Sequence, residues 1–238
     1  MSVSFFDMLK SIFLGSSTKE DEPEEESLLH IGWQQREENF YPSLFGEPEG
    51  APKLLTEEIF KQDFGRNAVH PFWLHHGVLT FPPTNERTTW LYATSGMSNA
   101  FDSEIEEWSG LGVEYILETA EKSDWAADKL ARLMTFNLLI AAGHYKDQSD
   151  LRVGSVVRLG LPVDGNENCI LRNFIALSPC TTTPEFQLVT GKVELLQMIA
   201  ISDAEAEFAD QEGHDALAQK LTGANHHQVI APRRSSVI

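Results

Sequence analysis

Three stretches decide the fold of this chain: WLYATSGMSN at residues 90–99, GVEYILET at residues 112–119 and VELLQMIAISDAEAEF at residues 193–208. In the first two, apolar and polar residues alternate, which is the pattern of a strand with one buried face. The third begins as a strand and changes to a helix at Ser202, where Glu205 completes a capping-box pattern. None of the three carries a nucleophile motif, a metal-ligand cluster or a phosphate-binding loop.

Further strands are expected at 72–81, 88–94, 154–161, 169–176 and near Val229, and the central stretches are extended to 112–121 and 192–201. Apolar residues at helical spacing predict a helix of about twenty residues from Ser123 to Gly143, long enough to cross one face of a sheet. Shorter helices are expected at 54–64, 202–213 and 215–221. Strands and helices do not alternate regularly, so the sequence predicts an α+β fold: a mixed, mainly antiparallel sheet with packed helices.

The chain is expected to divide into three parts. Residues 1–27 combine an amphipathic helix at 4–14 with an acidic flexible linker, and residues 28–53 place aromatics among Pro and Gly, which predicts an irregular segment draped over the fold. Residues 54–238 form the main domain. A helix as short as 4–14 is marginal alone, so its apolar face must dock on the domain, on a second copy or on a partner.

The chain of 238 residues has a net charge of −18 and a pI near 4.7. Such a charge argues against nucleic acid and anionic membranes as partners, because phosphates would be repelled. Solubility is one interpretation of this charge, and electrostatic steering of a basic protein partner is the other. The N-terminal apolar run is too short to span a bilayer and lacks the features of a secretory signal, so a cytoplasmic protein is expected.

No catalytic residue, metal or cofactor is predicted. His75 and His76 would point to opposite faces of a strand, without ligands at metal-binding spacing nearby. Ser95 lacks the glycine that a nucleophile elbow requires two residues earlier, where Ala93 stands. Cys169 and Cys180 are expected to be two buried thiols, with a disulfide as the alternative.

The three opening stretches, together with VIAPRRSSV at residues 229–237, resemble the suppressor of fused family from about Leu54 to the C-terminus. The resemblance implies a protein-binding function without catalytic activity. It also implies that Gly96 allows the turn after a strand and that Ser98 forms local hydrogen bonds. Arg233 and Arg234 would end the last strand, where they either bind a carboxylate or form an internal salt bridge.

A partner-binding surface is predicted between the strands at 90–99 and 112–119, where two aromatic residues flank an acidic turn. Exposed aromatics ringed by charge are typical of interaction hot spots, and the resemblance places this loop where the binding residues of animal members fall. This chain lacks the long insertions and the peptide-contact pattern of those members. Solvated loop charges and a catalytic carboxylate pair are the alternatives. The candidate residues are Phe101, Asp102, Glu104, Glu106, Glu107 and Trp108.

The resemblance is to bacterial-type, single-domain relatives, which implies an immunity protein that neutralises a toxin by occlusion. An acidic surface would suit a basic toxin. A cytoplasmic adaptor that binds a peptide by strand addition is one alternative, and a hydrolase with a carboxylate-lined cleft is another. The sequence leaves the oligomeric state open.

Overall fold

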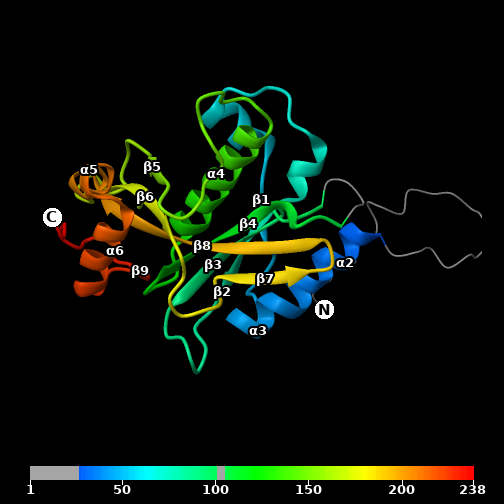
Figure 1. Ribbon diagram of the computed structural model, residues 1–238, viewed down its shortest axis with the longest axis horizontal. Helices are drawn as coiled ribbons and strands as arrows, with labels where there is room; N and C mark the ends of the chain where they lie inside the picture. The colour runs from blue at the N-terminus through cyan, green and yellow to red at the C-terminus, as the bar shows by residue number, and fades with distance from the viewer. Residues whose placement is uncertain (1–26, 101–104) are drawn as a thin grey trace, which may run out of the picture.

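The computed structural model describes residues 27–100 and 105–238, and within them the chain forms a nine-stranded mixed sheet. The strands follow the order β1-β2-β3-β4-β8-β6-β5 across the sheet, while β7 pairs with β8 and β9 pairs with β4 (Figure 1). Their bounds are β1 Lys53–Leu54, β2 Gly77–Phe81, β3 Trp90–Ser95, β4 Trp108–Thr119, β5 Val156–Arg158, β6 Leu171–Leu177, β7 Glu185–Leu188, β8 Gly191–Ser202 and β9 Val229–Ile230.

The centre of the sheet is the parallel pair of β4 and β8, each 12 residues long, in which Tyr115 lies beside Leu196. The short β9 is also parallel to β4, and the other pairings are antiparallel. The predicted fold class, a mixed and mainly antiparallel sheet with packed helices, is confirmed.

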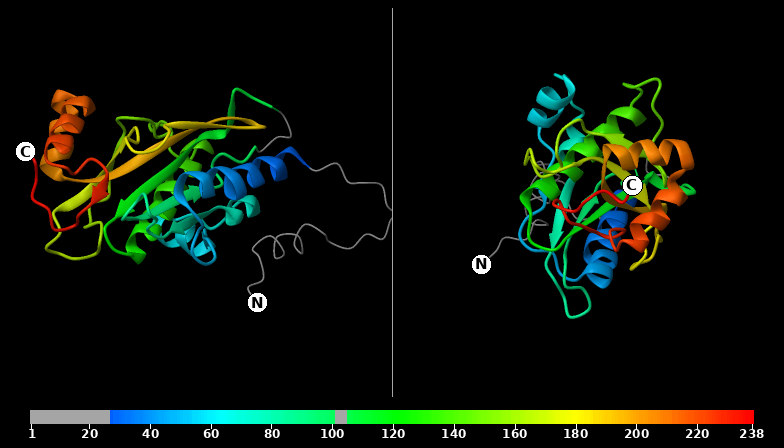
Figure 2. Two further views of the ribbon diagram at one scale, coloured as in Figure 1. Left: turned by 90° about the horizontal axis from the view of Figure 1, so that it is seen from below. Right: turned by 90° about the vertical axis from the view of Figure 1, so that its left-hand side faces the viewer.

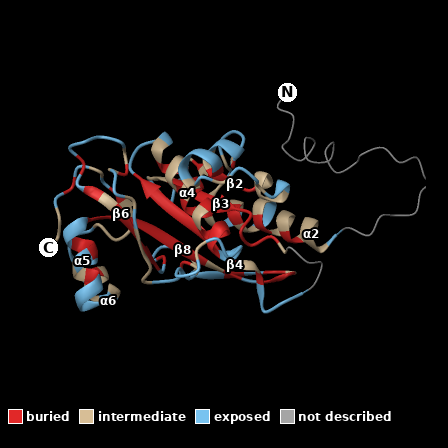
Figure 3. Ribbon diagram, turned by 90° about the horizontal axis from the view of Figure 1, so that it is seen from above, coloured by how far each residue is buried: buried red, intermediate tan, exposed pale blue. Residues whose placement is uncertain are grey.

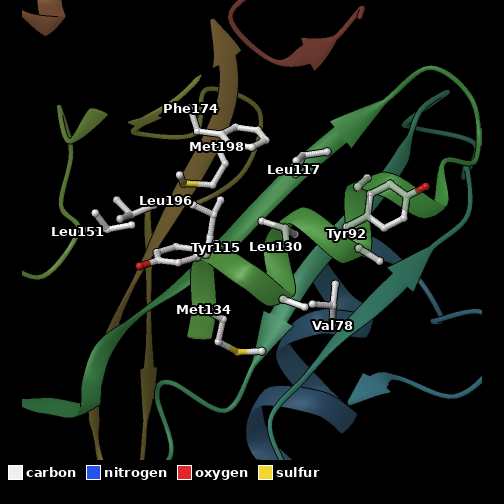
Figure 4. Close-up of a cluster of buried hydrophobic side chains, with 14 of the residues drawn as sticks. Val78, Tyr92, Tyr115, Leu117, Leu130, Met134, Leu151, Phe174, Leu196 and Met198 are labelled. Carbon is white, nitrogen blue, oxygen red and sulfur yellow. The ribbon is translucent and has the colours of Figure 1, made fainter. Parts of the chain in front are cut away.

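Helix α4 (Asp124–Ala141) packs against β2, β3 and β4 on one face of the sheet. Its buried residues, among them Leu130 and Met134, join Tyr92, Tyr115 and Leu196 in the largest apolar core (Figure 4). This long helix agrees with the helical spacing of the sequence between Ser123 and Gly143.

The opposite face of the sheet is covered at its two ends by different helices (Figures 1 and 2). At one end lie α2 (Leu28–Gln34), the π-helical segment η1 (Gln35–Phe40) and α3 (Tyr41–Phe45), which bury Tyr41 and Phe45 against the strands. At the other end, α5 (Asp203–Glu212) and α6 (His214–Gly223) cover a third apolar cluster. The capping box of Ser202 and Glu205 that begins α5 is confirmed, and Gly213 ends the helix.

Two expectations about local structure are wrong. Residues 28–45 are helical rather than irregular, because contacts with residues remote in the chain, such as those of Arg36, stabilise the segment. Pro42 is tolerated at the junction where η1 passes into α3. The strand expected from Phe72 begins only at Gly77, because Pro71–His75 forms a 3-10 helix (η3), capped by the side chain of His70. The expected helix at 54–64 is present as a shorter π-helical turn, η2 (Ile59–Asp63). The helix predicted at 4–14 and most of its linker lie outside the described residues.

Both cysteines are free thiols. Cys169 is buried as expected, but Cys180, which lies beyond the end of β6, is exposed. Among residues 27–100 and 105–238, no group of three or more His, Cys, Asp and Glu side chains is arranged to hold a metal ion. No helix in the same ranges combines the length and the apolar character that crossing a membrane requires.

Candidate functional site

The end of the predicted binding loop runs directly into the central strand β4. Glu106 and Glu107 are exposed, and so is Trp108, the first residue of β4, with 42% of its surface accessible. Ile105, which the sequence analysis did not select, is 67% exposed beside them. Phe101, Asp102 and Glu104 lie outside the described residues. Three of the predicted residues therefore lie together on the surface, with Ile105 as an additional exposed apolar side chain.

The backbone of this exposed segment is fixed by the turn between β7 and β8. The N–H of Glu106 donates to the carbonyl of Thr190 over 3.2 Å, and the carbonyl of Glu107 accepts from the N–H of Lys192 over 2.9 Å. At Gly191 a Cβ atom would stand 2.6 Å from the backbone nitrogen of Ser109, so only glycine allows this approach. The exposed side chains are thus carried on a backbone held by the sheet.

The two ends of the loop are also tied to each other. The hydroxyl of Ser109 donates to the carbonyl of Ser98 over 2.7 Å, and the N–H of Leu111 donates to the carbonyl of Met97 over 2.7 Å. The loop therefore leaves and rejoins the sheet at one place, and its position depends on the turn at residues 96–99.

A fully buried arginine from η1 holds that turn. The Arg36 guanidinium donates to the hydroxyls of Ser95 and Ser98, each over 2.9 Å, and to Oδ1 of Asn99 over 2.8 Å. Its Nη1 also lies 3.9 Å from Oε1 of Glu114 in β4. Arg36 thus joins the helical segment 28–45 to the start of the candidate loop. No local pattern in the sequence marks Arg36 as a functional residue, because burial of an arginine depends on partners that are remote in the chain.

Glu114 accepts three further hydrogen bonds from this turn. Its Oε1 accepts from the N–H groups of Gly96 and Ser98 at 3.0 and 2.9 Å and from the Ser98 hydroxyl at 2.7 Å. Gly96 has a φ of 138°, and a Cβ there would stand 2.4 Å from the ring of His76. The implied turn role of Gly96 agrees with this geometry. Ser98 bonds a different strand and a helix rather than its own turn.

Two titratable groups beside Arg36 are shifted by their surroundings. Burial raises the pKa of Glu37, although the Arg36 charge and a hydrogen bond from the Ser95 hydroxyl oppose the shift. Burial, together with the positive charge of Arg36, lowers the pKa of His76 to about 3. His76 is therefore neutral at physiological pH, which fits a structural position better than that of a proton-transfer group.

The paired arginines near the C-terminus have separate positions. Arg234 is buried and forms an internal salt bridge, in which Nη1 lies 2.6 Å from Oε1 of Glu205 at the start of α5, while Arg233 is exposed. Burial by itself would raise the pKa of Glu205, but hydrogen bonds from Arg234, Ser202 and Val237 bring it below its usual value. Of the two roles that the resemblance left open, the internal salt bridge is the one that Arg234 has.

Comparison with known proteins places this architecture in a family. The family model described as suppressor of fused protein matches residues 73–235, most of the chain. The chain belongs to the suppressor of fused family. The match includes the whole of β4 and β8, and thus the exposed segment that begins at Ile105. No curated protein sequence matches the chain closely enough to count as a relative.

Solved structures of suppressor of fused proteins have a similar fold. The crystal structure of the Sufu–Fu complex matches 79% of this chain and 93% of that chain, with 16% identity and a TM-score of 0.56. Drosophila Suppressor of Fused matches 68% of this chain but 42% of its own, with 18% identity and a TM-score of 0.54. A SUFU homologue from Neisseria gonorrhoeae matches 70% of this chain and 91% of its own, with 20% identity and a TM-score of 0.48. This suppressor of fused member therefore spans less than half of the Drosophila chain.

Proposed function

We propose that this suppressor of fused member is a non-enzymatic protein-binding module whose contact surface is centred on Trp108. The observation that carries the proposal is the exposure of Trp108 and Ile105 on a backbone fixed by the turn between β7 and β8. Exposed, rigidly held aromatics of this kind supply most of the binding energy at protein interfaces. The fold shared with Sufu in the Sufu–Fu complex supports the same conclusion.

The partner that fits this surface is a basic protein. Glu106 and Glu107 directly precede Trp108, and the chain carries a net charge of −18, so a positively charged partner would be attracted from a distance. We include in the proposed surface three residues that precede Ile105 closely in the sequence: Phe101, Asp102 and Glu104. The function that fits is that of a bacterial cytoplasmic immunity protein, which occludes the active surface of a basic toxin.

A peptide adaptor that works by strand addition is the second candidate, and the edge strand β5 favours it. The N–H of Leu159 donates to the carbonyl of Arg172 over 3.0 Å, and the carbonyl of Ser155 accepts from Ala176 over 2.9 Å. Because partners alternate along an antiparallel pair, the backbone groups of Val156 and Arg158 point away from the sheet, where an added strand would bind them.

The hydrolase alternative gains less support, because Glu106 and Glu107 stand on a surface rather than in a cleft.

Capture from cell extract with three variants separates these functions. Trp108→Ala is the test, and Leu161→Ala is its matched control, because Leu161 is also exposed, at 67%, but follows β5. Loss of a captured protein with Trp108→Ala and its retention with Leu161→Ala supports the proposal. Arg158→Pro removes an outward N–H from β5, which an edge strand tolerates. Loss of the captured protein with this variant instead would identify strand addition as the binding mode.

A further inference from the structure

One corner of the sheet, where β4 and β8 start and β7 runs beside them, has a face that no helix within residues 27–100 and 105–238 covers. Lys192 is paired with Trp108 of β4 on one side and with Gln187 of β7 on the other. In the next exposed row, Glu194 is paired directly with Glu185. We call these five residues the β7–β8 face: Trp108, Glu185, Gln187, Lys192 and Glu194.

The direction of these side chains follows from strand alternation. Phe186 and Val193 are buried in the core beneath η1 and α3, so their neighbours in β7 and β8 point to the other side of the sheet. Further along β8 that other side is covered, and Leu196 is fully buried there. At the corner Lys192, Gln187 and Glu185 are exposed and Glu194 is half-buried. Figure 3 shows that β8 is buried along most of its length. The covering elements therefore end before this corner.

The β7–β8 face contains an unfavourable contact of its own. Glu185 and Glu194 are direct cross-strand partners, and like charges in that arrangement destabilise a sheet. Neither carboxylate forms an ion pair with any other residue that the structure describes. Lys192, two residues before Glu194 on the same face, is paired with Gln187 rather than with either glutamate, so it offsets only part of this repulsion. A second positive charge brought to this face would relieve it further.

We propose that the β7–β8 face docks an arginine-bearing segment of the basic partner. One guanidinium would lie between the carboxylates of Glu185 and Glu194, and the same segment would cover the exposed indole of Trp108. The strands lie about 4.8 Å apart and alternate residues about 6.7 Å apart, so a single extended segment spans both positions. Arginine fits better than lysine, because its planar fork binds two carboxylate oxygens and stacks on an indole.

This proposal rests on the protein-binding function and names the chemistry that the surface selects. It extends the contact region from the loop, which ends at Trp108, to two strands that lie more than seventy residues further along the chain. A partner seated there would also contact Glu106 and Glu107, because their backbone is bonded to the same β7–β8 turn.

Titration of the full-length protein with a capped hexa-arginine peptide tests the proposal, with amide and indole NMR shifts as the signal. The largest shifts are expected at Trp108, Glu185 and Glu194. Changing Glu185 and Glu194 together to Gln should weaken binding at least fivefold. The matched control is Glu207→Gln with Glu212→Gln on α5, which removes the same charge from another exposed place and should weaken binding less than twofold. Equal weakening by both pairs, or equal binding of a hexa-lysine peptide, would overturn the proposal.

A measurement without any partner tests the premise separately. Glu185→Gln should raise the urea midpoint of unfolding, because it removes the cross-strand repulsion, and a midpoint that stays the same or falls would contradict it. Capture of a partner from cell extract distinguishes failure of the arginine-docking proposal from failure of the protein-binding function. If Trp108→Ala loses the captured protein while the Glu185 and Glu194 variant keeps it, docking of an arginine between these two carboxylates is excluded and the protein-binding function remains.

Discussion

The replacement Arg36→Met tests the central claim about how the candidate loop is held. Arg36 is fully buried, its guanidinium bonds Ser95, Ser98 and Asn99, and it is an ion-pair partner of the buried Glu114. Methionine fills much of the space but leaves a buried carboxylate without its counter-charge, which typically costs about 3–5 kcal/mol of unfolding free energy. For a chain of this size that loss lowers the melting temperature by roughly 6–20 °C.

Chemical denaturation at pH 7 measures this loss, and Arg132→Met is the matched control. Arg132 also forms an ion pair, over 2.7 Å with Asp63, but its side chain is 42% exposed, so its loss should cost less than about 1 kcal/mol. Arg36→Lys should fall between wild type and Arg36→Met, because it keeps the charge without the fork. If Arg36→Met costs no more than Arg132→Met, the buried network does not stabilise the fold and our reasoning about the loop fails.

Three further predictions concern the same region. Glu37→Gln should stabilise the protein at pH 7 and lose that advantage near pH 4. The raised pKa of Glu37 means that the fold favours the protonated acid, so the stability of the wild type falls as the pH rises above 4.5. Urea midpoints of unfolding at both pH values measure this, and an advantage that persists at low pH would contradict the stated cause. Gly96→Ala should cost about 1–3 kcal/mol, since the backbone conformation is strained for alanine and the new methyl group meets the ring of His76, whereas Gly143→Ala, with a positive φ but open space, should cost less in the same assay. Trp108→Ala should keep the wild-type melting temperature within a few degrees, because much of the indole is exposed; thermal unfolding would reveal a core position by a loss of about 3–5 kcal/mol instead.

The parts of the fold that the sequence predicted are those with a local signal. The capping box at Ser202 and Glu205 fixes the start of α5 through bonds that span three residues, and α4 follows from the spacing of apolar residues between Ser123 and Gly143. Alternation in 90–99 similarly predicted β3, with its buried Tyr92. Such patterns are properties of a single element, and they survive in any tertiary context that buries one face.

The helical segment 28–45 escaped prediction because its stability comes from tertiary contacts. Gly32 packs against the side chain of Thr190, Gln35 accepts a hydrogen bond from the N–H of Val189, and Arg36 is buried against the turn at 96–99. None of these partners is near in sequence, and the segment holds Gly and Pro residues that weigh against a helix when it is considered alone. The short β7 escaped for a similar reason, because four residues carry too little periodicity to be recognised.

Part of the candidate site could likewise be predicted from local composition, and part depends on how distant strands pair. A turn with aromatic and acidic residues at 101–108 is visible in the sequence, and Glu106, Glu107 and Trp108 do lie together on the surface. What composition cannot show is the second acidic pair, because Glu185 and Glu194 become neighbours only through the register of β7 and β8. The turn that sets this register, at Thr190 and Gly191, also holds the backbone of the loop. Because one turn positions both groups of charges, a change at Gly191 should displace the loop and the β7–β8 face together, whereas a change at Arg36 should act on the loop alone.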